Sequence, residues 1–306
     1  MMEKEKRITR RRKYPYLRAV QRTLYQVQNV RIACYNRFQA LLNTCAECGG
    51  RMEHRLKRDP LQYDRAEDQE EEEKKKRCHC RGKPAGLITL DQFTSLTHTI
   101  ATRCENLENA MDGPIRETLR DVPIYEWLSG IWGCGHRLGA SVIANIDPIS
   151  EFPTISKLWA YAGMDVVDGR GTSASSGNER KWNWELHCLA CEKLPGQFVK
   201  QGRFYRRQYD LIKADYKAAH PEELDKGRRS KTGKVILSYT PIHIERMTRR
   251  KLGKLFLAHL WLVWRRTEGL PVTDPYIAAI GGHTGMIEPP ESPEPKPDEE
   301  AEPGHE

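Results

Sequence analysis

No stretch of this 306-residue chain approaches the roughly 20 consecutive apolar residues that a membrane-spanning helix needs. Its basic start, MMEKEKRITRRRKY, is followed by no apolar run, so a secretory signal is not expected either. We therefore expect a cytoplasmic protein with no membrane partner. Residues 1–120 also lack alternating β-strands and an acidic residue closing an apolar strand, so a two-metal carboxylate site is not expected there.

Charged residues make up 30% of the chain and hydrophobic residues 38%, with a mean hydropathy of −0.72, as in a soluble protein of about two domains. The nine cysteines, partly spaced as CxxC and CxC, fit reduced thiols or metal ligands better than disulfides. The net charge of +8 is uneven, because residues 288–306 hold eight acids against one lysine. The basic remainder indicates a polyanion partner, with ordinary solvated side chains as the alternative for each cluster. The main clusters are Arg10, Arg11, Arg12 and Lys13, and Lys226, Arg228, Arg229, Lys231 and Lys234.

Two long helical patterns occupy the first third of the chain. Apolar residues recur three and four apart over residues 17–41, interrupted only at Arg31, and again over residues 90–111, as in a coiled-coil seam. We expect Gly113-Pro114 to end the second helix. Two helices of similar length on either side of an insertion predict an antiparallel helical hairpin arm over residues 1–113. The arm also offers a surface for a homo-oligomer.

The insertion between these helices, residues 45–82, contains two close pairs of cysteines. A CxxC followed by two glycines is typical of a zinc knuckle, because the turn lets both sulfurs face one tetrahedral ion. The second pair is spaced as CxC, so His79 or His54 can take the place of one sulfur, and unliganded thiols are the alternative. Bound zinc would be structural and would hold the tip of the arm together. The predicted ligands are Cys45, Cys48, Cys78 and Cys80.

A third cysteine pair, Cys188 and Cys191, lies in WNWELHCLACEKL, where tryptophans and leucines predict a buried helix. We interpret these two cysteines as small buried hydrophobic residues. His187 is adjacent, but no second pair of ligands accompanies it, so we predict no metal there.

The stretch from Leu128 to Ile146, LSGIWGCGHRLGASVIANI, predicts a helix, a glycine turn and a second helix. Gly133 and Gly135 give the turn backbone angles closed to other residues and let another molecule approach closely. Backbone N–H groups at the start of the second helix, at the positive end of its dipole, suit a phosphate. His136 and Arg137 add side-chain donors. The motif is a helix-hairpin-helix if it contacts nucleic acid, and an ordinary αα-hairpin if its glycines only permit close packing.

Residues 131–164, which include GCGHRLGASVIANIDPISEFPTISKLWAYAGM, resemble the C-terminal domain of insertion-sequence transposases of the one-ten type. Members of that family typically read GIGPxTAxxLLAEIGDxxRFxSxxxLAAYAGL, and the alignment needs no gap. The RFYR at residues 203–206 and the helical stretch 244–264 resemble later blocks, so the likeness covers roughly the second half of the chain. The resemblance implies a DNA-binding domain over residues 114–278 that acts in DNA transposition or recombination. It also implies a guide RNA as a second ligand.

In that family a serine after this region is thought to attack DNA and become covalently joined to it. The loop over residues 168–177 contains Ser173 and Ser176, the candidate nucleophiles by resemblance, while the ungapped alignment places Arg170-Gly171 at that point. A serine needs a base or a metal nearby to act as a nucleophile. The family's RuvC-like domain, whose DEDD carboxylates hold divalent metal, has no counterpart here, so Mg²⁺ is expected only if a catalytic partner is supplied.

Two functions follow from this reading. One is a transposase-family DNA-binding protein of a mobile element without a DEDD metal domain of its own. The other is a non-catalytic accessory or regulatory protein that binds nucleic acid. A chemically competent serine with a metal partner would make the chain an enzyme.

The last expected helix begins at Thr240-Pro241, a good N-cap and first-turn pair, and continues through Trp264. Its first half is basic and suits a phosphate backbone, with Arg246, Arg249 and Arg250 as candidate contacts. Its second half is apolar. Residues 279–306 are rich in proline and acids, which predicts a disordered acidic tail. The sequence thus predicts an all-α fold: an arm with a zinc-knuckle-like tip, a helix-hairpin-helix domain and C-terminal helices.

Overall fold

The computed structural model describes residues 12–42, 44–45, 47–48, 93–167, 170–171, 182–220, 228–229, 235–236, 240–272 and 287–291. In this part of the chain the regular structure is almost entirely helical, which confirms the prediction of an all-α fold class. The strands found there are two residues long and pair antiparallel: β1 (Val166–Val167) with β2 (Arg170–Gly171), and β3 (Arg228–Arg229) with β4 (Val235–Ile236). None of the described helices is long and apolar enough to cross a membrane.

The chain divides into two compact units: residues 19–114, here called the arm unit, and residues 1–18 with 115–306, here called the main unit. In the arm unit, α1 (Pro15–Leu42) contacts α4 (Phe93–Ala110) through an ion pair in which Arg31 Nε lies 2.6 Å from Glu108 Oε1. Further along α1, Cys34 is near Cys104, whose thiol pKa is raised by burial and by Cys34. These partners follow one another in opposite chain directions, so the two helices run antiparallel.

The break after α4 differs from the predicted one. We expected Gly113-Pro114 to end the helix, but α4 ends at Ala110 and α5 (Asp112–Arg120) begins two residues later. Gly113 and Pro114 therefore lie in the first turn of α5. Proline is tolerated there because its missing N–H has no partner within the helix at that position.

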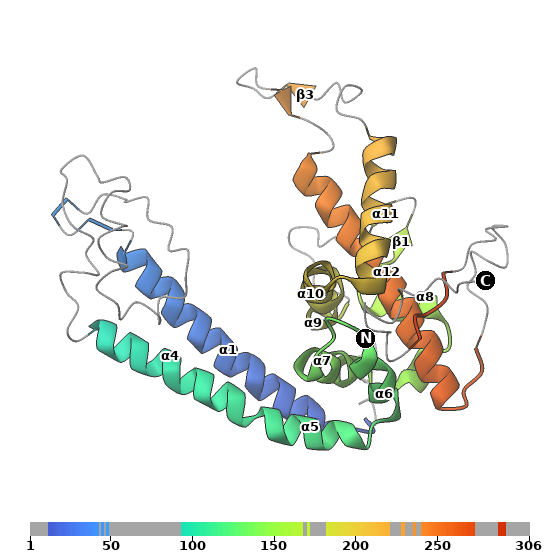
Figure 1. The fold of residues 1–306 in the computed structure, drawn as a ribbon, viewed down its shortest axis with the longest axis horizontal. Coiled ribbons are helices and arrows are strands. Elements are labelled where there is room, and N and C mark those ends of the chain that lie inside the picture. Colours follow the sequence, from blue (N-terminus) through green and yellow to red (C-terminus); the bar gives the residue numbers. More distant parts are fainter. Residues whose placement is uncertain are drawn as a thin grey trace, which may run out of the picture. The chain divides into compact units, whose positions relative to one another are not determined.

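Most helices of the main unit pack on one long helix. In chain order it contains α6 (Pro123–Gly130), α7 (His136–Ile146), the 3-10 turn η2 (Ile149–Glu151), α8 (Ile155–Tyr161), α9 (Trp184–Cys188), the π-helical segment η3 (Leu189–Lys193), α10 (Leu194–Gln201), α11 (Arg203–Ala219) and α12 (Pro241–Thr267). The long helix α12 contacts α6, α8, η3, α10 and α11 (Figure 1).

The core of the main unit gathers aromatic rings around α12. Phe256 stacks near Trp127 of α6, with ring centres 6.3 Å apart, and lies 5.3 Å from Phe198 of α10. Phe198 in turn stacks on Tyr205 of α11 at 4.5 Å. These rings are buried, so the second half of α12 provides the apolar surface that its sequence predicts.

Local signals set the ends of two helices as expected. The Thr240 hydroxyl accepts a hydrogen bond from the His243 N–H at 3.2 Å, which confirms Thr240 as the N-cap of α12. At the end of α8, Gly163 adopts a φ of +63°, and the Met164 N–H donates to the Trp159 carbonyl at 2.8 Å. This left-handed glycine ends the helix, as glycines commonly do just after a last helical turn.

Residues 287–291 differ from the predicted disordered tail. The structure places them against the main unit, where the Pro290 carbonyl accepts from the Trp127 indole N–H at 3.1 Å. The Ile287 carbonyl lies 2.8 Å from His259 Nε2. Composition alone did not predict this order, because the contacts are made by buried donors far away in the sequence. The remaining residues of the predicted tail lie outside the described part of the chain.

Candidate nucleic-acid interface

The turn that joins α6 to α7 occupies residues 131–135, where the sequence places its glycine turn. The Ile131 N–H donates to the Leu128 carbonyl at 3.2 Å, and the Cys134 N–H donates to the Ile131 carbonyl at 3.0 Å. Gly135 is then the N-cap of α7, and no side chain caps the helix. This eleven-residue helix therefore begins directly after a glycine and has no capping side chain.

The two glycines of the turn differ in what surrounds them. Gly133 has a φ of +91°, and a Cβ there would lie 3.2 Å from both the Gln197 carbonyl carbon and Phe198 Cδ1 in α10. Gly135 has a φ of −62°, and a Cβ there would meet nothing within 4 Å. Gly133 thus allows close packing inside the protein, while only Gly135 leaves open space for an approaching molecule.

The side chains that follow Gly135 are half-buried. His136 and Arg137 both have interactions within the protein. The main chain of Arg137 also accepts a hydrogen bond from Ser141 Oγ at 2.8 Å. Between the glycines, Cys134 is fully buried, and burial raises the pKa of its thiol to about 12. This thiol therefore stays protonated and serves packing.

An aromatic residue that sequence reasoning passed over marks this turn. Trp132 is 41% exposed, and the guanidinium of Arg203 lies 4.7 Å from the centre of its ring. Arg203 is the first residue of α11 and has a φ of +71°, directly after Gly202 at +81°. A non-glycine residue in this region is strained, so the packing around it must hold it in place. In the sequence, the signal was a tryptophan directly before the first glycine of the turn.

The predicted basic contacts on α12 fall into two kinds. Arg246 is exposed. Arg249 donates from Nε to Glu245 Oε1 at 2.7 Å, and Arg250 Nη2 donates to the Asp165 carbonyl at 3.2 Å. Two of the three candidates are therefore already engaged within the protein. Nearby, the Lys254 ammonium lies 4.2 Å from the Trp159 ring centre, and its pKa is lowered by burial and by Arg250.

The start of α12 is held against α11 by a cluster around Glu245. Lys213 Nζ lies 2.7 Å from both Glu245 Oε2 and the Tyr209 hydroxyl, and that hydroxyl also donates to Glu245. Burial alone would raise the pKa of Glu245, but the hydrogen bonds from Lys213, Tyr209 and Arg249 outweigh it and lower the pKa to about 2. Glu245 is therefore ionised at neutral pH and anchors the two helices.

The structure does not gather the predicted DNA contacts into one cluster. Arg203 lies beside the turn at the beginning of α11, whereas the Glu245 cluster meets α11 at Tyr209 and Lys213. Lys213 lies ten positions after Arg203 in this helix, or about 15 Å along the axis. The three predicted arginine contacts of α12 therefore form a group separate from the turn, and α11 connects the two places. This group consists of Arg246, Arg249 and Arg250.

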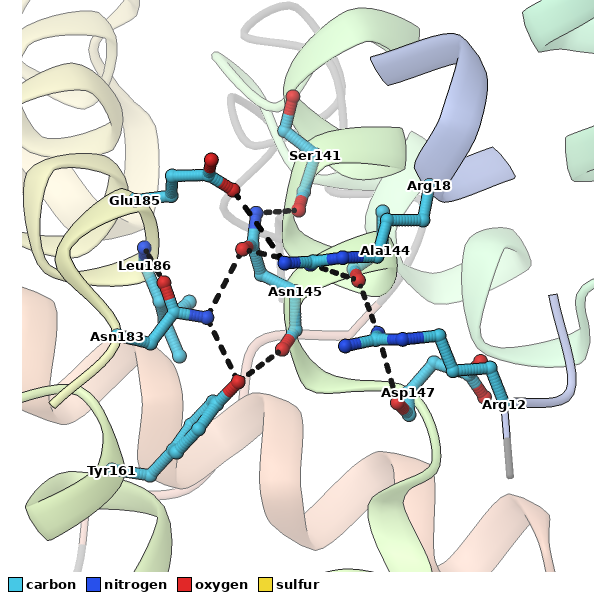
Figure 2. Close-up of polar contacts among 10 residues, drawn as sticks. All are labelled: Arg12, Arg18, Ser141, Ala144, Asn145, Asp147, Tyr161, Asn183, Glu185 and Leu186. Carbon is cyan, nitrogen blue, oxygen red and sulfur yellow. Dashed lines mark hydrogen bonds and ion pairs between the residues drawn. The ribbon is translucent and has the colours of Figure 1, made fainter. Parts of the chain in front are cut away.

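The N-terminal basic cluster is partly used inside the main unit. Arg12 Nη1 donates to the Ala144 carbonyl at 2.8 Å and to the Asp147 carbonyl at 3.2 Å, and Arg18 Nη1 also donates to Ala144, at 2.9 Å (Figure 2). These carbonyls end α7, where the negative end of the helix dipole favours cations. Lys13 pairs with Glu268 at 2.8 Å. Arg12 and Lys13 thus both have partners within the fold, and their contact with a polyanion stays a prediction.

The other members of the basic clusters are not described in the same detail. Arg10 and Arg11 lie outside the described residues, as do Lys226, Lys231 and Lys234. Arg228 and Arg229 form β3, which pairs with β4.

A polar network joins the C-terminal end of α7 to α8 and α9 (Figure 2). Asn183 caps α9, since its Oδ1 accepts from the Leu186 N–H at 3.1 Å. Its Nδ2 donates to Asn145 Oδ1 at 3.1 Å and to the Tyr161 hydroxyl at 2.9 Å. The end of α7 is thus tied to the two helices α8 and α9 that follow it in the chain.

Most of the predicted catalytic and metal-binding residues lie outside the described part of the chain. Ser173, Ser176, Cys78 and Cys80 lie outside the described residues. Cys45 is buried and Cys48 is exposed. Where the structure is described, no group of three or more His, Cys, Asp or Glu side chains is placed to hold a metal ion. The zinc site and the serine nucleophile therefore remain predictions.

The cysteine pair of residues 188 and 191 is half-buried at the junction of α9 and η3. Burial raises the pKa of the Cys191 thiol to about 12. The adjacent His187 has its Nδ1 2.9 Å from the Ala162 carbonyl oxygen and stacks on Trp184 at 5.4 Å.

The chain matches no protein-family model, no curated protein and no solved structure.

Proposed function

We propose that the main unit binds nucleic acid at the turn before α7, in a transposase-related protein of a mobile element that acts in DNA transposition or recombination. The observation that carries the proposal is Trp132, an exposed indole in this turn with the Arg203 guanidinium 4.7 Å from its ring centre. An exposed aromatic face stacks on any base, and an arginine beside it supplies positive charge for a phosphate.

The backbone next to Trp132 supports the same role. Gly135 has open space where a Cβ would be, and α7 begins immediately after it. The positive end of the helix dipole then favours a phosphate oxygen near the backbone of Gly135. Such contacts are independent of base identity, so we propose binding with little sequence preference at this turn. If the turn binds nucleic acid in this way, α6, the turn and α7 together form a helix-hairpin-helix.

The exposed basic residues of α11 and α12 extend the proposed surface. The seventeen residues of α11 span about 25 Å, or roughly seven base pairs at 3.4 Å each. Arg246 at the start of α12 is the best-placed of the three predicted α12 contacts, because it is exposed while Arg249 and Arg250 have partners in the protein. Guide RNA is the second proposed ligand, on the strength of the resemblance alone.

The finer parts of the architecture belong to the same proposal. We propose that the arm closes around zinc held by Cys45, Cys48, Cys78 and Cys80, and that the arm offers a surface for a homo-oligomer. Zinc here would stabilise the tip of the arm.

Catalysis separates the proposed function from a purely accessory role. Phosphodiester attack by Ser173 or Ser176 needs an activated hydroxyl and charge neutralisation on the phosphate. We propose that a separate subunit supplies the carboxylates and Mg²⁺ for that step. The chain alone, incubated with a suicide DNA substrate and Mg²⁺, is then expected to form no covalent adduct. An adduct that is lost in Ser173→Ala would instead identify an enzyme.

The binding proposal is tested with two matched tryptophan variants. Trp132→Ala removes the stacking face in the turn, and Trp184→Ala removes another exposed tryptophan, 46% exposed on α9. We expect Trp132→Ala to weaken binding of fluorescent single-stranded DNA or RNA by about tenfold, as loss of one base stack does. Trp184→Ala should leave the affinity unchanged. Equal effects of the two variants, or none from Trp132→Ala, would count against the turn as the contact.

A further inference from the structure

Residues 287–291 meet the main unit through their backbone. The Ile287 carbonyl accepts from His259 Nε2 at 2.8 Å, and the Pro290 carbonyl accepts from Trp127 Nε1 at 3.1 Å. The two donors belong to α12 and α6, and their side chains are only 3% and 9% exposed. The main unit thus recognises the main chain of this segment with donors from two different helices.

The His259 donor is set in advance by its own partner. A carbonyl can only accept, so Nε2 of His259 carries the hydrogen, and Nδ1 accepts from the Tyr205 hydroxyl 2.9 Å away. Tyr205 is buried and stacked on Phe198, which limits its movement. Burial lowers the pKa of His259 to about 4, against the opposing effect of the bond to Ile287. At neutral pH this imidazole is uncharged, with one N–H directed at the segment.

The spacing of the two carbonyls matches an extended proline helix. Residues 287 and 290 are three apart, and a polyproline II helix has three residues per turn, so in that conformation their carbonyls would point to the same side. Pro289 and Pro290 fix their own φ near the required value, and Glu288 before proline is biased toward the same region. Such a segment loses little conformational entropy when it binds.

Aromatic rings stand behind both donors. Trp127 stacks near Phe256 at 6.3 Å, and Phe204 lies 5.9 Å from His259. Tyr205 meets Phe256 edge-on at 5.6 Å. Aromatic walls with donors aimed at backbone carbonyls are the usual means by which proteins bind proline-rich peptides.

We propose that Trp127 and His259, with the aromatic rings behind them, form a binding site for extended peptides containing Pro-Pro, and that residues 287–291 are its tethered occupant. The site is distinct from the proposed nucleic-acid contact at Trp132 and does not depend on it. If the segment left, the buried N–H of His259 would lose its carbonyl partner, which is costly unless an equivalent peptide replaces it. Residues 273–286 tether the segment to α12, so its effective concentration at the site is high and an added peptide competes poorly.

The test uses the full chain with a weakened tail. Pro289→Gly with Pro290→Gly removes the φ restriction of the tethered segment, and a fluorescent peptide copying residues 285–293 is then titrated in. We expect the glycine variant to bind this peptide at least tenfold more tightly than the unchanged chain does, because its own segment occupies the site less. Equal binding to the two chains would overturn the proposal.

Two controls make the result specific to the proposed site. A peptide with glycine at the positions of Pro289 and Pro290 should bind the glycine variant at least tenfold more weakly than the proline peptide. Adding Trp127→Phe to the glycine variant removes the indole N–H and keeps an aromatic ring, and should also weaken binding at least tenfold. If the glycine variant bound both peptides with equal affinity, the proposal would be refuted, and this comparison needs no substitution in the core of the protein. Undiminished binding by a folded Trp127→Phe chain would refute it as well.

Discussion

The guanidinium of Arg203 lies 4.7 Å from the centre of the Trp132 ring, which joins the first residue of α11 to the turn that precedes α7. Arg203 and Gly202 both have positive φ, so the backbone at the start of α11 is bent to a conformation that most residues avoid. The Trp132 side chain is 41% exposed, while Arg203 is half-buried beside it. This pair gives the proposed interface both a stacking surface and a cation.

Replacing Arg203 with glutamine should weaken nucleic-acid binding and reduce its dependence on salt. If Arg203 contacts a phosphate, the slope of log K against log salt concentration falls by about one in magnitude. Arg266→Gln is the matched control, because Arg266 is an exposed arginine at the C-terminal end of α12. Fluorescence anisotropy at several salt concentrations gives both slopes. Identical slopes for Arg203→Gln and the unchanged chain would exclude a phosphate contact by Arg203.

The two glycines of the turn should respond differently to alanine. Gly133→Ala forces a Cβ to 3.2 Å from α10 and strains a φ of +91°, so we expect a loss of about 1–2 kcal/mol in the free energy of unfolding. Gly135→Ala meets no neighbour, so we expect a smaller loss of about 0.5 kcal/mol, roughly the difference between glycine and alanine as N-caps. Urea denaturation measures both values. A Gly133→Ala protein as stable as the unchanged chain would show that α10 yields at this contact.

This difference also decides how the turn is to be probed. A valine at Gly133 would disturb the packing against Phe198 before it affected any ligand. Substitutions at Gly135 and Trp132 change the outer side of the turn and report on binding.

Stability should fall in acid through the cluster around Glu245. Its pKa is about 2 in the folded protein, below the ordinary carboxyl value of 4.5, so the folded state favours the ionised form. The stabilisation is therefore complete above about pH 4.5 and is lost as the pH falls toward 2. Because Glu245 is partly exposed, we expect about 1–2 kcal/mol in total. Unfolding of Glu245→Gln, measured from pH 6 to pH 3, should show less of this fall, and an equal fall would rule out Glu245 as its source.

Zinc should accompany the freshly purified, reduced protein in about one equivalent, as a four-cysteine site requires. Cys45→Ser with Cys48→Ser should remove it, whereas Cys188→Ser with Cys191→Ser should not. Elemental analysis of the three proteins decides the matter. Metal-free protein, or zinc lost only from the second variant, would contradict the predicted ligands.

Local features of the fold were predictable where one residue determines the outcome. Thr240 caps α12 and Gly163 stops α8 because an N-cap hydroxyl and a left-handed glycine act within one turn of the chain. The positions of α6, the turn and α7 follow from the same kind of signal. The partners of cationic side chains, by contrast, cannot be predicted from the local sequence. Arg12 was expected to face a polyanion but donates to the end of α7, more than a hundred residues away.

The remaining differences have the same physical origin. The stacking of Arg203 on Trp132 depends on how α11 packs beside the turn, which no local pattern encodes. The order of residues 287–291 depends on donors from α6 and α12 that only the assembled core brings together. A proline-rich composition predicts disorder because such a segment has no core of its own. It does not reveal whether another part of the protein binds that segment.

The claim that the turn before α7 contacts nucleic acid is tested most directly by photocrosslinking. The full chain is irradiated with single-stranded DNA carrying 5-bromouracil, digested, and analysed by mass spectrometry for the residues joined to a nucleotide. We expect crosslinks at Trp132 and within residues 132–137, and their loss in Trp132→Ala. Crosslinks found only elsewhere in the chain, and unchanged in that variant, would contradict the proposed interface.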